Sequence, residues 1–576
     1  MKTLPIGKHT FADIRHDNML YVDKTAYIHR LITRGSAYFL SRPRRFGKSL
    51  TLSTLDAIFS GKRDLFDGLA IAETDYSWET FPIIRLDMSK LDFSSVDTLK
   101  QAIILNLEKI AISYALQLDV RGGIQFAFAT LIENIFAKHG KVVVLIDEYD
   151  KPISEHLTDI PLAIALRDLL SDFYSILKSS DEYLRFVFLT GVSKFAKAGV
   201  FSKLNHLDDI TMVPDYTALC GYTQAELEFY FKDHIEGLAH PPTPSTEGVN
   251  TFYQGVPFGH PLDPEISSER AAALSIPSQK GVQGTTVGSP LNESSPPPGR
   301  GQGVGHSPTD QVLEKIKTWY NGYRFSTANV RVYNPFSTLL LFQHRVFKNY
   351  WFETGTPNLL IDLIKNKQYN LENADGAETS EFSFSTYELE RLEILPLLVQ
   401  TGYLTIQDYD PEWMLYRLGF PNFEVKNSFL NHLLNAYTAE DTLANNQLKT
   451  LIQSLQRRDL PTFFEALKIF FAKIPYDIQL RDEKYYQSIF YIIFTLIGLK
   501  ITAEVRTNTG RIDAIVETAD TVFLFEFKVD DTAQNAMNQI NEKGYAFGFS
   551  KSSKTLQKIG VSFSTKERNV AEWIAV

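Results

Sequence analysis

The amino-acid sequence predicts an α/β protein. A parallel sheet with helical crossovers is followed by a mainly helical region and a second α/β unit. Strand-like and helix-like segments alternate over residues 1–236, as expected for parallel strands joined by helices. The apolar runs at 141–146 and 185–189 are almost continuous, which is typical of strands buried on both faces. From about residue 476 the pattern is a helix, several strands and a further helix.

The first unit is expected to contain strands separated by helices. Strands are predicted at 37–40, 82–88, 141–146 and 185–189, and helices at 49–59, 97–118, 162–177 and 224–236.

The region 311–440 is expected to be mainly helical. One short hairpin, around 402–406 and 414–418, resembles the wing of a winged helix; simple packing is the alternative. The predicted division is a first α/β unit (1–236), an insertion (237–310), a helical region that completes the first unit (311–440), a helical linker (441–475) and a second α/β unit (476–576).

The insertion stands out by composition. Residues 241–310 hold 12 of the 25 prolines, together with 10 glycines, and show no sustained periodicity. Such a composition is typical of disorder. We therefore expect a disordered segment inserted between two helices of a folded domain, with little loss of stability, because the closure entropy of a long loop grows slowly with its length.

Composition and charge exclude several classes of protein. With 576 residues and 44% hydrophobic residues, the chain has the composition of an ordinary globular protein. Its net charge of −10 argues against a histone-like protein that binds nucleic acid through overall positive charge. The one cysteine, Cys220, favours a reducing cytoplasm. No signal peptide is expected at the N-terminus, and the apolar run 489–499 is too short to span a bilayer. We therefore expect a cytoplasmic protein with no membrane partner.

The segment RPRRFGKS, which begins at Arg42, follows a predicted strand and opens a helix, as a phosphate-binding P-loop requires. Its last three residues match the end of the Walker A pattern, although an arginine stands where the first glycine should be. Among these last three residues, Gly47 lets the backbone turn its N–H groups inward, Lys48 reaches the outer phosphates and Ser49 ligates Mg²⁺. Arg44 and Arg45 would add phosphate contacts or act on a neighbouring chain; the alternative is a basic loop with an incidental match.

A second motif follows the strand at 142–146. Adjacent carboxylates at a strand end match Walker B, in which Asp147 would hold Mg²⁺ through water and Glu148 would polarise the attacking water. A solvated acidic turn is the alternative. Thr190 and Ser193 end a third strand, where polar side chains act either as sensors of the outer phosphate or as ordinary caps.

A cluster of charged residues is predicted near the C-terminus, on strands at 510–516 and 521–528 joined by a turn at 517–520. On the second strand Glu526 and Lys528 share one face with Leu524, whereas Phe523, Phe525 and Phe527 share the other. If Val516 pairs with Thr521, Asp513 lies opposite Leu524 and diagonal to Glu526. Two carboxylates and a lysine can hold a hard cation beside a phosphodiester. An edge strand with a solvated Glu–Lys pair is the alternative.

The motifs FLSRPRRFGKSLTLSTL, VVVLIDEYDKPI, LTGVSKF and KTWYNGYRFS resemble the prokaryotic AAA-ATPase-like family. GRIDAIVE, FLFEFKVD and NQINEKGYA resemble its usual C-terminal partner, a PD-(D/E)XK nuclease superfamily domain. The resemblance covers nearly all of the chain outside 241–310. It implies a P-loop NTPase fold, a C-terminal restriction-endonuclease-like fold, and ATP and Mg²⁺ as cofactors, with Lys48, Ser49, Asp147 and Glu148 in the ATPase roles given above.

For the C-terminal domain the resemblance implies a nuclease site. Asp513 and Glu526 would be metal ligands, Lys528 the catalytic lysine and Gln539 a polar active-site residue on the next helix. A further carboxylate, from an upstream helix, would be Glu483, with Glu504 as its competitor.

The function expected from the sequence is an ATP-binding and ATP-hydrolysing protein coupled to a metal-dependent nuclease. Nucleic acid is the expected partner, DNA rather than RNA, and a homo-oligomer is an open expectation. One alternative is a nucleotide-dependent switch or signalling module with an inactive nuclease-like domain. The equal numbers of basic and acidic residues in 462–576, 14 of each, favour it mildly. Another is a decaying gene product interrupted by the insertion.

Overall fold

A computed structural model describes most of the chain. The residues outside the description are 196–202, 241–306, 352–357, 368, 370, 372–373, 387, 439–440, 473, 475–482, 502–503, 509–511, 519 and 543–553. Most of the predicted insertion, residues 241–306 of 237–310, thus lies outside the described residues, whereas residues 237–239 end one helix and Pro308 begins the next.

The first unit contains a parallel sheet in the strand order β2-β3-β4-β1-β5, and every neighbouring pair is parallel. This confirms the predicted fold class. All residues of β3 are buried, which explains the aliphatic run that precedes its final aspartate. The strands are β1 (Ala37–Ser41), β2 (Ile83–Asp87), β3 (Val142–Asp147), β4 (Leu184–Gly191) and β5 (Asp208–Asp209).

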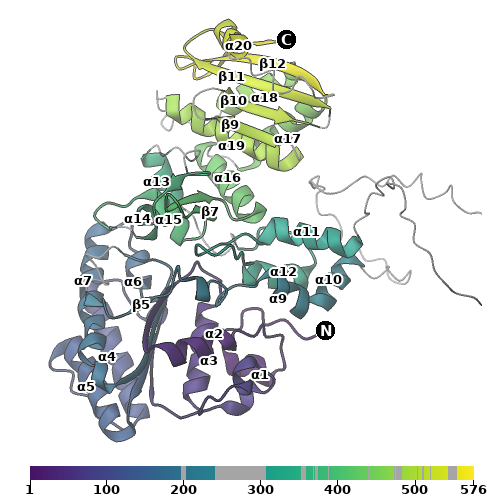
Figure 1. Ribbon diagram of the computed structural model, residues 1–576. Helices are drawn as coiled ribbons and strands as arrows, with labels where there is room; N and C mark the ends of the chain where they lie inside the picture. The colour runs from purple at the N-terminus through teal and green to yellow at the C-terminus, as the bar shows by residue number, and fades with distance from the viewer. Residues whose placement is uncertain are drawn as a thin grey trace, which may run out of the picture.

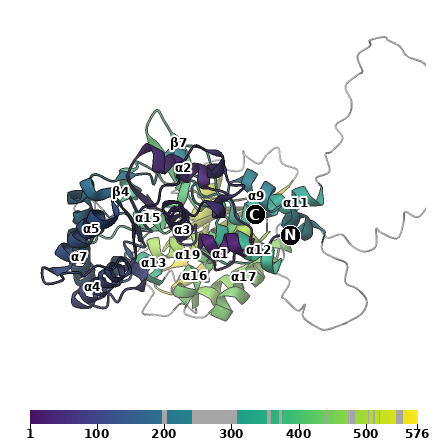
Figure 2. The same ribbon diagram turned by 90° about the horizontal axis from the view of Figure 1, so that it is seen from below.

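Helices cover both faces of this sheet. The helix that follows β1 packs with the first helix on one side, and three long helices pack together on the other (Figure 1 and Figure 2). The first group comprises α1 (Phe11–His16), α2 (Thr25–Arg34) and α3 (Lys48–Phe59), and the second α4 (Val96–Ser113), α5 (Gly123–His139) and α7 (Ile160–Ser179), with the short α6 (Lys151–Ser154) before α7. The helix predicted at 97–118 ends earlier, at Ser113.

A helical cluster follows the sheet, on the side opposite α4, α5 and α7 (Figure 2). It consists of α9 (Gln224–Tyr230), α10 (Lys232–Ala239), α11 (Pro308–Tyr320) and α12 (Pro335–His344), which share an aromatic core. The single helix predicted at 224–236 is broken at Phe231. Because α10 and α11 pack against each other, the helices on either side of residues 241–306 hold together by their own contacts.

The middle region combines helices with a small antiparallel sheet of order β6-β8-β7. The predicted hairpin is present as β7 and β8, joined by a third short strand that the sequence did not predict. The elements are α13 (Asn358–Asn366), β6 (Glu378–Thr379), α14 (Phe382–Ser385), α15 (Ile394–Gln400), β7 (Thr405–Asp410), β8 (Leu415–Gly419) and α16 (Phe423–Thr438).

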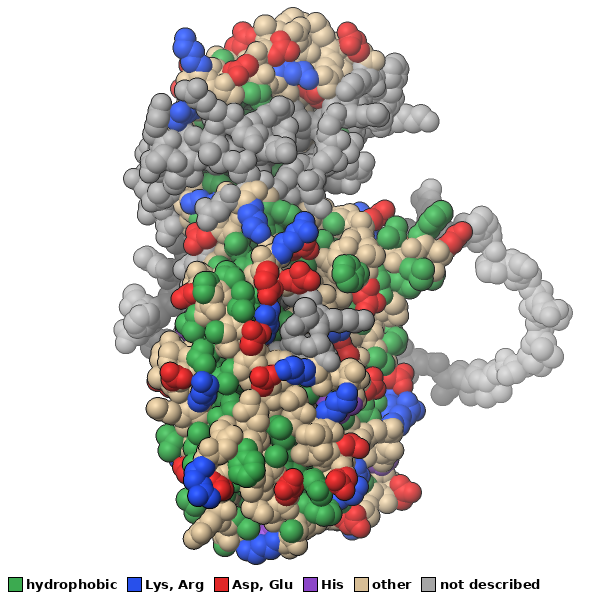
Figure 3. All heavy atoms as spheres, turned by 90° about the vertical axis from the view of Figure 1, so that its left-hand side faces the viewer, with side chains coloured by type: hydrophobic (Ala, Val, Ile, Leu, Met, Phe, Trp, Pro, Cys, Tyr) green, Lys and Arg blue, Asp and Glu red, His purple; other side chains and the backbone are tan. Residues whose placement is uncertain are grey.

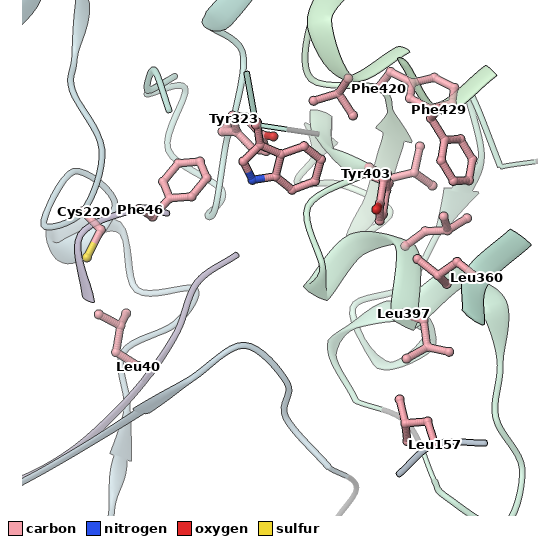
Figure 4. Close-up of a cluster of buried hydrophobic side chains, with 14 of the residues drawn as sticks. Leu40, Phe46, Leu157, Cys220, Tyr323, Leu360, Leu397, Tyr403, Phe420 and Phe429 are labelled. Carbon is pink, nitrogen blue, oxygen red and sulfur yellow. The ribbon is translucent and has the colours of Figure 1, made fainter. Parts of the chain in front are cut away.

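The middle region also backs the P-loop. The ring of Phe46 packs edge-on against Tyr323 at 4.7 Å, and the same apolar cluster continues to Tyr403, Phe420 and Phe429 (Figure 4). The loop and the middle region therefore share one core.

The C-terminal unit is a mixed sheet of order β13-β12-β11-β10-β9, in which only β11 and β12 are parallel. Helix α20 makes the crossover between them and packs on one face, and α18 and α19 cover the other. The elements are α17 (Asp441–Gln456), α18 (Leu460–Ala472), α19 (Glu483–Ile501), β9 (Glu504–Asn508), β10 (Ile512–Glu517), β11 (Thr521–Val529), α20 (Ala533–Glu542), β12 (Thr555–Ser564) and β13 (Asn569–Ala575).

Two features of this unit differ from the sequence-based expectation. The segment 441–475 contains two helices, α17 and α18, as its helical pattern predicts, but it is no linker, because Phe463 of α18 packs on Phe525 of the sheet and Phe464 stacks on Trp573. Strands β12 and β13 follow the helix with which the predicted pattern ended.

The apolar run 489–499 lies in α19, and its residues 489–497 are buried between protein elements, as expected. Among the described residues, no helix combines the length and apolarity needed to cross a membrane. On the face shown in Figure 3, acidic and basic side chains of the described residues are interspersed.

Candidate functional site

The P-loop joins the end of β1 to the start of α3. Gly47 has a φ of 94°, a left-handed conformation that glycine adopts without strain. Lys48 follows as the first residue of α3 and is only 4% exposed. Its Nζ donates to the carbonyl oxygens of Arg42 at 3.1 Å and Pro43 at 3.2 Å. The lysine is therefore held inside the loop, at the N-terminal end of the helix.

Arg42, at the position where Walker A has its first glycine, points into the protein. Its guanidinium donates to the carbonyl oxygens of Thr211 at 2.8 Å and Tyr216 at 3.3 Å, and lies 4.3 Å from the ring centre of Phe325. Burial lowers the pKa of Arg42 to about 10. The side chain fastens the loop to the segment beside β5, a structural role that the sequence motif alone does not reveal.

The Walker B residues lie beside this loop. Asp147 ends β3 and is 4% exposed, and the hydroxyl of Ser49 lies beside its carboxylate. Burial raises the pKa of Asp147, whereas the Ser49 hydroxyl and the Lys48 charge oppose the rise. One strand, β4, separates β3 from β1. The fold thus brings together the serine and the aspartate expected to serve one Mg²⁺, which prefers oxygen ligands and keeps several waters.

A cleft of about 410 Å³ opens over the P-loop. Glu148, with a φ of 51°, lines it together with Lys48 and Ser49. Arg44 and Arg45 line it as well: Arg44 pairs with Glu155 at 3.3 Å, and the Arg45 guanidinium lies 4.6 Å from the ring centre of Phe336. The predicted loop residues and Glu148 therefore surround one cleft. Further lining residues, which the sequence reasoning missed, are Pro5, Gly7, Lys8, His9, Ser89, Lys151, Tyr222, Pro335 and Leu339.

Thr190 and Ser193 do not line the cleft. Thr190 is fully buried, and its hydroxyl donates to the carbonyl of Leu40 at 2.8 Å. The backbone N–H of Ser193 donates to Asp150 at 2.7 Å. This geometry favours the capping role over the sensor role for both residues.

Asp150 is a buried carboxylate that fixes the end of β4. It accepts from the backbone N–H groups of Val192 and Ser193. Burial, helped by the nearby charge of Glu148, raises the pKa of Asp150 from its ordinary 3.8 to about 6.

This shift predicts a pH dependence of folding. The folded state binds a proton at Asp150 more tightly than the unfolded state does. The stability that this proton contributes to the folded state is therefore fully present below about pH 4 and is lost as the pH rises through about 6. Relative to Asp150→Asn, whose amide oxygen still accepts a hydrogen bond, the wild type should lose on the order of 1–3 kcal/mol of unfolding free energy over this interval. Urea titrations at several pH values measure the unfolding free energy. The prediction would be contradicted if this free energy changed with pH in the same way in the wild type and in Asp150→Asn.

The charged cluster of the C-terminal sheet is centred on β11. Val516 pairs with Phe523 and Ala514 with Phe525, so the register is shifted by two residues from the pairing considered from sequence. Continued by one residue, this register sets position 513 directly across from Glu526, where neighbouring Cα atoms lie about 4.5–5.5 Å apart. The side chain of Asp513 lies outside the described residues.

Glu526, Lys528 and Gln539 come together. Glu526 is 2% exposed, and the Lys528 Nζ lies 3.7 Å from its Oε1. The same Nζ donates to Oε1 of Gln539, on α20, at 2.5 Å. Strand β11 lies between β10 and β12, so the alternative of a solvated pair on an edge strand is wrong.

A glycine on β12 brings α20 close to this cluster. Gly560 pairs with Glu526, and a Cβ at this position would lie 2.4 Å from the carbonyl oxygen of Ala533. Only glycine allows the start of α20 to approach the strand this closely. The close approach holds Gln539 over Lys528.

The two candidates for a third carboxylate lie at opposite ends of the sheet. Glu504 pairs with Glu517, at the end of β10 away from position 513. Glu483 begins α19, about two helical turns before Phe490, whose ring lies 4.2 Å from that of Phe527. The start of α19 therefore lies toward the end of β11 that carries Glu526 and Lys528, although α19 covers the opposite face of the sheet. The side chains of Glu483 and Glu504 lie outside the described residues.

Within the part of the chain whose side chains are described, no three acidic, histidine or cysteine side chains gather into a metal-binding group. A metal in the C-terminal domain would thus need Asp513 or Glu483 in addition to Glu526. These residue types suit a hard divalent cation.

Comparisons with known proteins match both units of the chain. A model of the predicted AAA-ATPase family matches residues 5–201, and a model of the PD-(D/E)XK nuclease superfamily matches residues 481–573. The chain belongs to the AAA-ATPase-like family and carries a C-terminal PD-(D/E)XK nuclease superfamily domain. The first match contains the P-loop, β3 and β4 of this AAA-ATPase-like protein, and the second contains β9 to β12 and most of β13.

The AAA-ATPase-like protein is similar over its whole length to an uncharacterized protein encoded in the vnfD 5′ region of Azotobacter chroococcum mcd 1. The two are 35% identical over 588 residues, which cover 100% of this chain and 98% of the relative. Among solved structures, the ORC2 protein of Aeropyrum pernix, in ADPNP–ADP complexes, matches 72% of this chain and 93% of its own, with 12% identity and a TM-score of 0.24. That similarity is too low to support an argument about function.

Proposed function

We propose that this protein binds and hydrolyses ATP with Mg²⁺ in the P-loop cleft and that the bound nucleotide controls a metal-dependent nuclease in the C-terminal domain. The observation that carries the ATP part is the meeting of Lys48, Ser49 and Asp147 at one end of the parallel sheet. A small cavity of about 60 Å³ adjoins the cleft at Gly47 and is lined by Tyr21, Tyr222 and mostly apolar residues.

In hydrolysis each residue has a separate role. The P-loop backbone and Lys48 bind the outer phosphates, and Ser49 and Asp147 hold the cation. Glu148, in the same cleft, orients the attacking water and accepts its proton. Bound Mg²⁺ would neutralise phosphate charge.

In the nuclease domain Glu526 and Asp513 would hold the metal ion, which polarises the scissile phosphate and activates water. Lys528, fixed by Gln539 and Glu526, donates to a phosphate oxygen or to the attacking water. We propose DNA rather than RNA as the substrate, and the cytoplasm as the location. Cleavage assays with labelled DNA and RNA, single- and double-stranded, test the substrate; cleavage of RNA alone would contradict it.

A chain of buried contacts supports coupling between the two sites. The Trp351 indole N–H donates to the carbonyl of Arg44 in the P-loop at 3.2 Å, and its backbone N–H donates to Glu424 of α16 at 2.7 Å. Helix α16 packs against α19 of the nuclease domain, and Lys426 of α16 and Tyr491 of α19 both bond to Asp375 (Figure 1). A shift of the P-loop can reach the nuclease sheet through these contacts.

This path predicts the effect of Trp351→Phe, which removes the indole N–H but keeps an aromatic ring. We expect ATP to bind as in the wild type, whereas the change in cleavage rate caused by ATP should fall several-fold. The matched control is Trp413→Phe, because Trp413 is 71% exposed after β7. Cleavage rates with and without ATP measure the effect. An ATP response that survives in the Trp351 variant would contradict the path.

The contacts of the two P-loop arginines indicate whether they act within their own chain or on a neighbouring chain of a homo-oligomer. Arg44 and Arg45 both find partners within their own chain, Glu155 and Phe336, so their geometry favours action on their own nucleotide over action on a neighbour. The native mass, measured with and without ATP, tests whether copies of the chain assemble.

A second candidate function keeps the nucleotide switch but makes the C-terminal domain a binding module without activity. The equal numbers of acidic and basic residues in 462–576 favour this candidate, because a nuclease domain uses positive charge to attract the phosphates of nucleic acid. Nucleic-acid binding without metal-dependent cleavage would support this candidate.

A further inference from the structure

Lys151 is a cleft residue to which none of the Walker roles applies. It begins α6, directly after the Walker B turn, and its backbone N–H donates to the carbonyl of Glu148 at 2.9 Å. Its side chain, 22% exposed, lines the cleft with Lys48 and Glu148. A further positive charge therefore lines the cleft next to Glu148, which would orient the attacking water.

One carboxylate holds this lysine and a P-loop arginine together. Oε1 of Glu155 pairs with Nζ of Lys151 and lies 3.3 Å from Nη2 of Arg44. Partial burial acts to raise the pKa of Glu155, but the contacts with Lys151 and Arg44 outweigh it and lower that pKa. Glu155 is not among the residues that line the cleft. The carboxylate thus pairs with two cations that line the cleft, while it lies outside the lining itself.

We propose that Lys151 and Arg44 distinguish a nucleoside triphosphate from a diphosphate by exchanging Glu155 for the terminal phosphate. This inference rests on the proposed nucleotide site. The terminal phosphate lies beside the water that Glu148 would orient, and Lys151 shares the turn with Glu148. Because all three side chains of the ion-pair cluster are partly exposed, breaking the pairs costs little. The phosphate offers both cations more negative charge than a single carboxylate does.

The test is equilibrium binding of ADP and of a non-hydrolysable ATP analogue, each with Mg²⁺, to the full chain. Lys151→Met should weaken binding of the triphosphate analogue about tenfold and change ADP binding little, the size expected for losing one charge-assisted contact. Glu155→Gln should strengthen triphosphate binding relative to ADP, because it releases both cations. Lys151→Arg should keep the preference. The control is Lys100→Met. Lys100 lies on the exposed face of α4, and among the contacts described it pairs only with Asp97.

The outcomes separate this inference from the proposed function. If the wild type binds neither nucleotide, the proposed nucleotide site is wrong and the inference fails with it. If the wild type binds both but Lys151→Met leaves the ratio of the two affinities unchanged, the inference alone is wrong. A triphosphate preference that falls in Glu155→Gln would also overturn it.

Discussion

Glu526→Gln is expected to abolish metal-dependent cleavage, lowering the rate by at least about 100-fold. The substitution keeps the shape of a side chain that is 2% exposed, so the sheet should fold as before. It removes the negative charge that a divalent cation requires next to position 513. The cleavage rate at saturating Mg²⁺ or Mn²⁺, together with the melting temperature of each protein, measures the effect.

The matched control is Glu517→Gln. Glu517 lies on the neighbouring strand of the same sheet and pairs with Lys554 at 2.8 Å, at the end of β10 away from the cluster. This variant should cleave at the wild-type rate. Cleavage that persists in Glu526→Gln, or that falls equally in both variants, would show that the buried glutamate is not a metal ligand.

Lys48→Ala is expected to weaken ATP binding by about 100-fold or more, because the lysine makes charge-assisted contacts with the outer phosphates. The side chain is buried, and its Nζ bonds to the carbonyls of its own loop. Its loss therefore also loosens the loop. Calorimetric titration with MgATP measures the affinity, and any effect of ATP on cleavage should disappear in the same variant.

Lys62→Ala provides the comparison, since Lys62 is exposed just beyond the end of α3 and carries the same charge. ATP should bind to it as to the wild type. Equal affinities of the Lys48 and Lys62 variants for ATP would place the nucleotide elsewhere or exclude it.

The strands of the first sheet could be predicted because burial on both faces leaves an unmistakable sequence. β3 is aliphatic from Val142 to Ile146, and every one of its residues is buried. The order of the strands could not be predicted. The pairing between β1 and β4 joins residues far apart in the chain, and no local pattern specifies it. The carboxylates could nevertheless be assigned to one end of the sheet, since parallel strands all end on the same edge.

The face of β11 that carries Glu526 could be predicted, but not its partner on β10. The true register differs by two residues, which leaves every side chain on its face. The turn decides it: the Thr518 N–H donates to the carbonyl of Thr521, and the hydroxyl groups of both threonines donate to Asp520. These local hydrogen bonds are not visible in the alternation of the strands. They bring position 513 opposite Glu526.

Long-range contacts account for the other differences. Helix α18 was predicted as part of a linker because its apolar face gives no indication of its partner, which is the C-terminal sheet. The inward direction of Arg42 depends on carbonyl groups of 211 and 216, far away in sequence. The Lys151–Glu155 pair, by contrast, was readable as a four-residue spacing after the Walker B motif.

The central claim is that nucleotide binding controls a metal-dependent nuclease. The most direct test is cleavage of labelled single- and double-stranded DNA and RNA with Mg²⁺ or Mn²⁺, with and without ATP, by the wild type and Glu526→Gln. We predict DNA cleavage by the wild type only, at a rate that changes with ATP. Equal inertness of both proteins under all conditions, or cleavage that ignores ATP, would contradict the account.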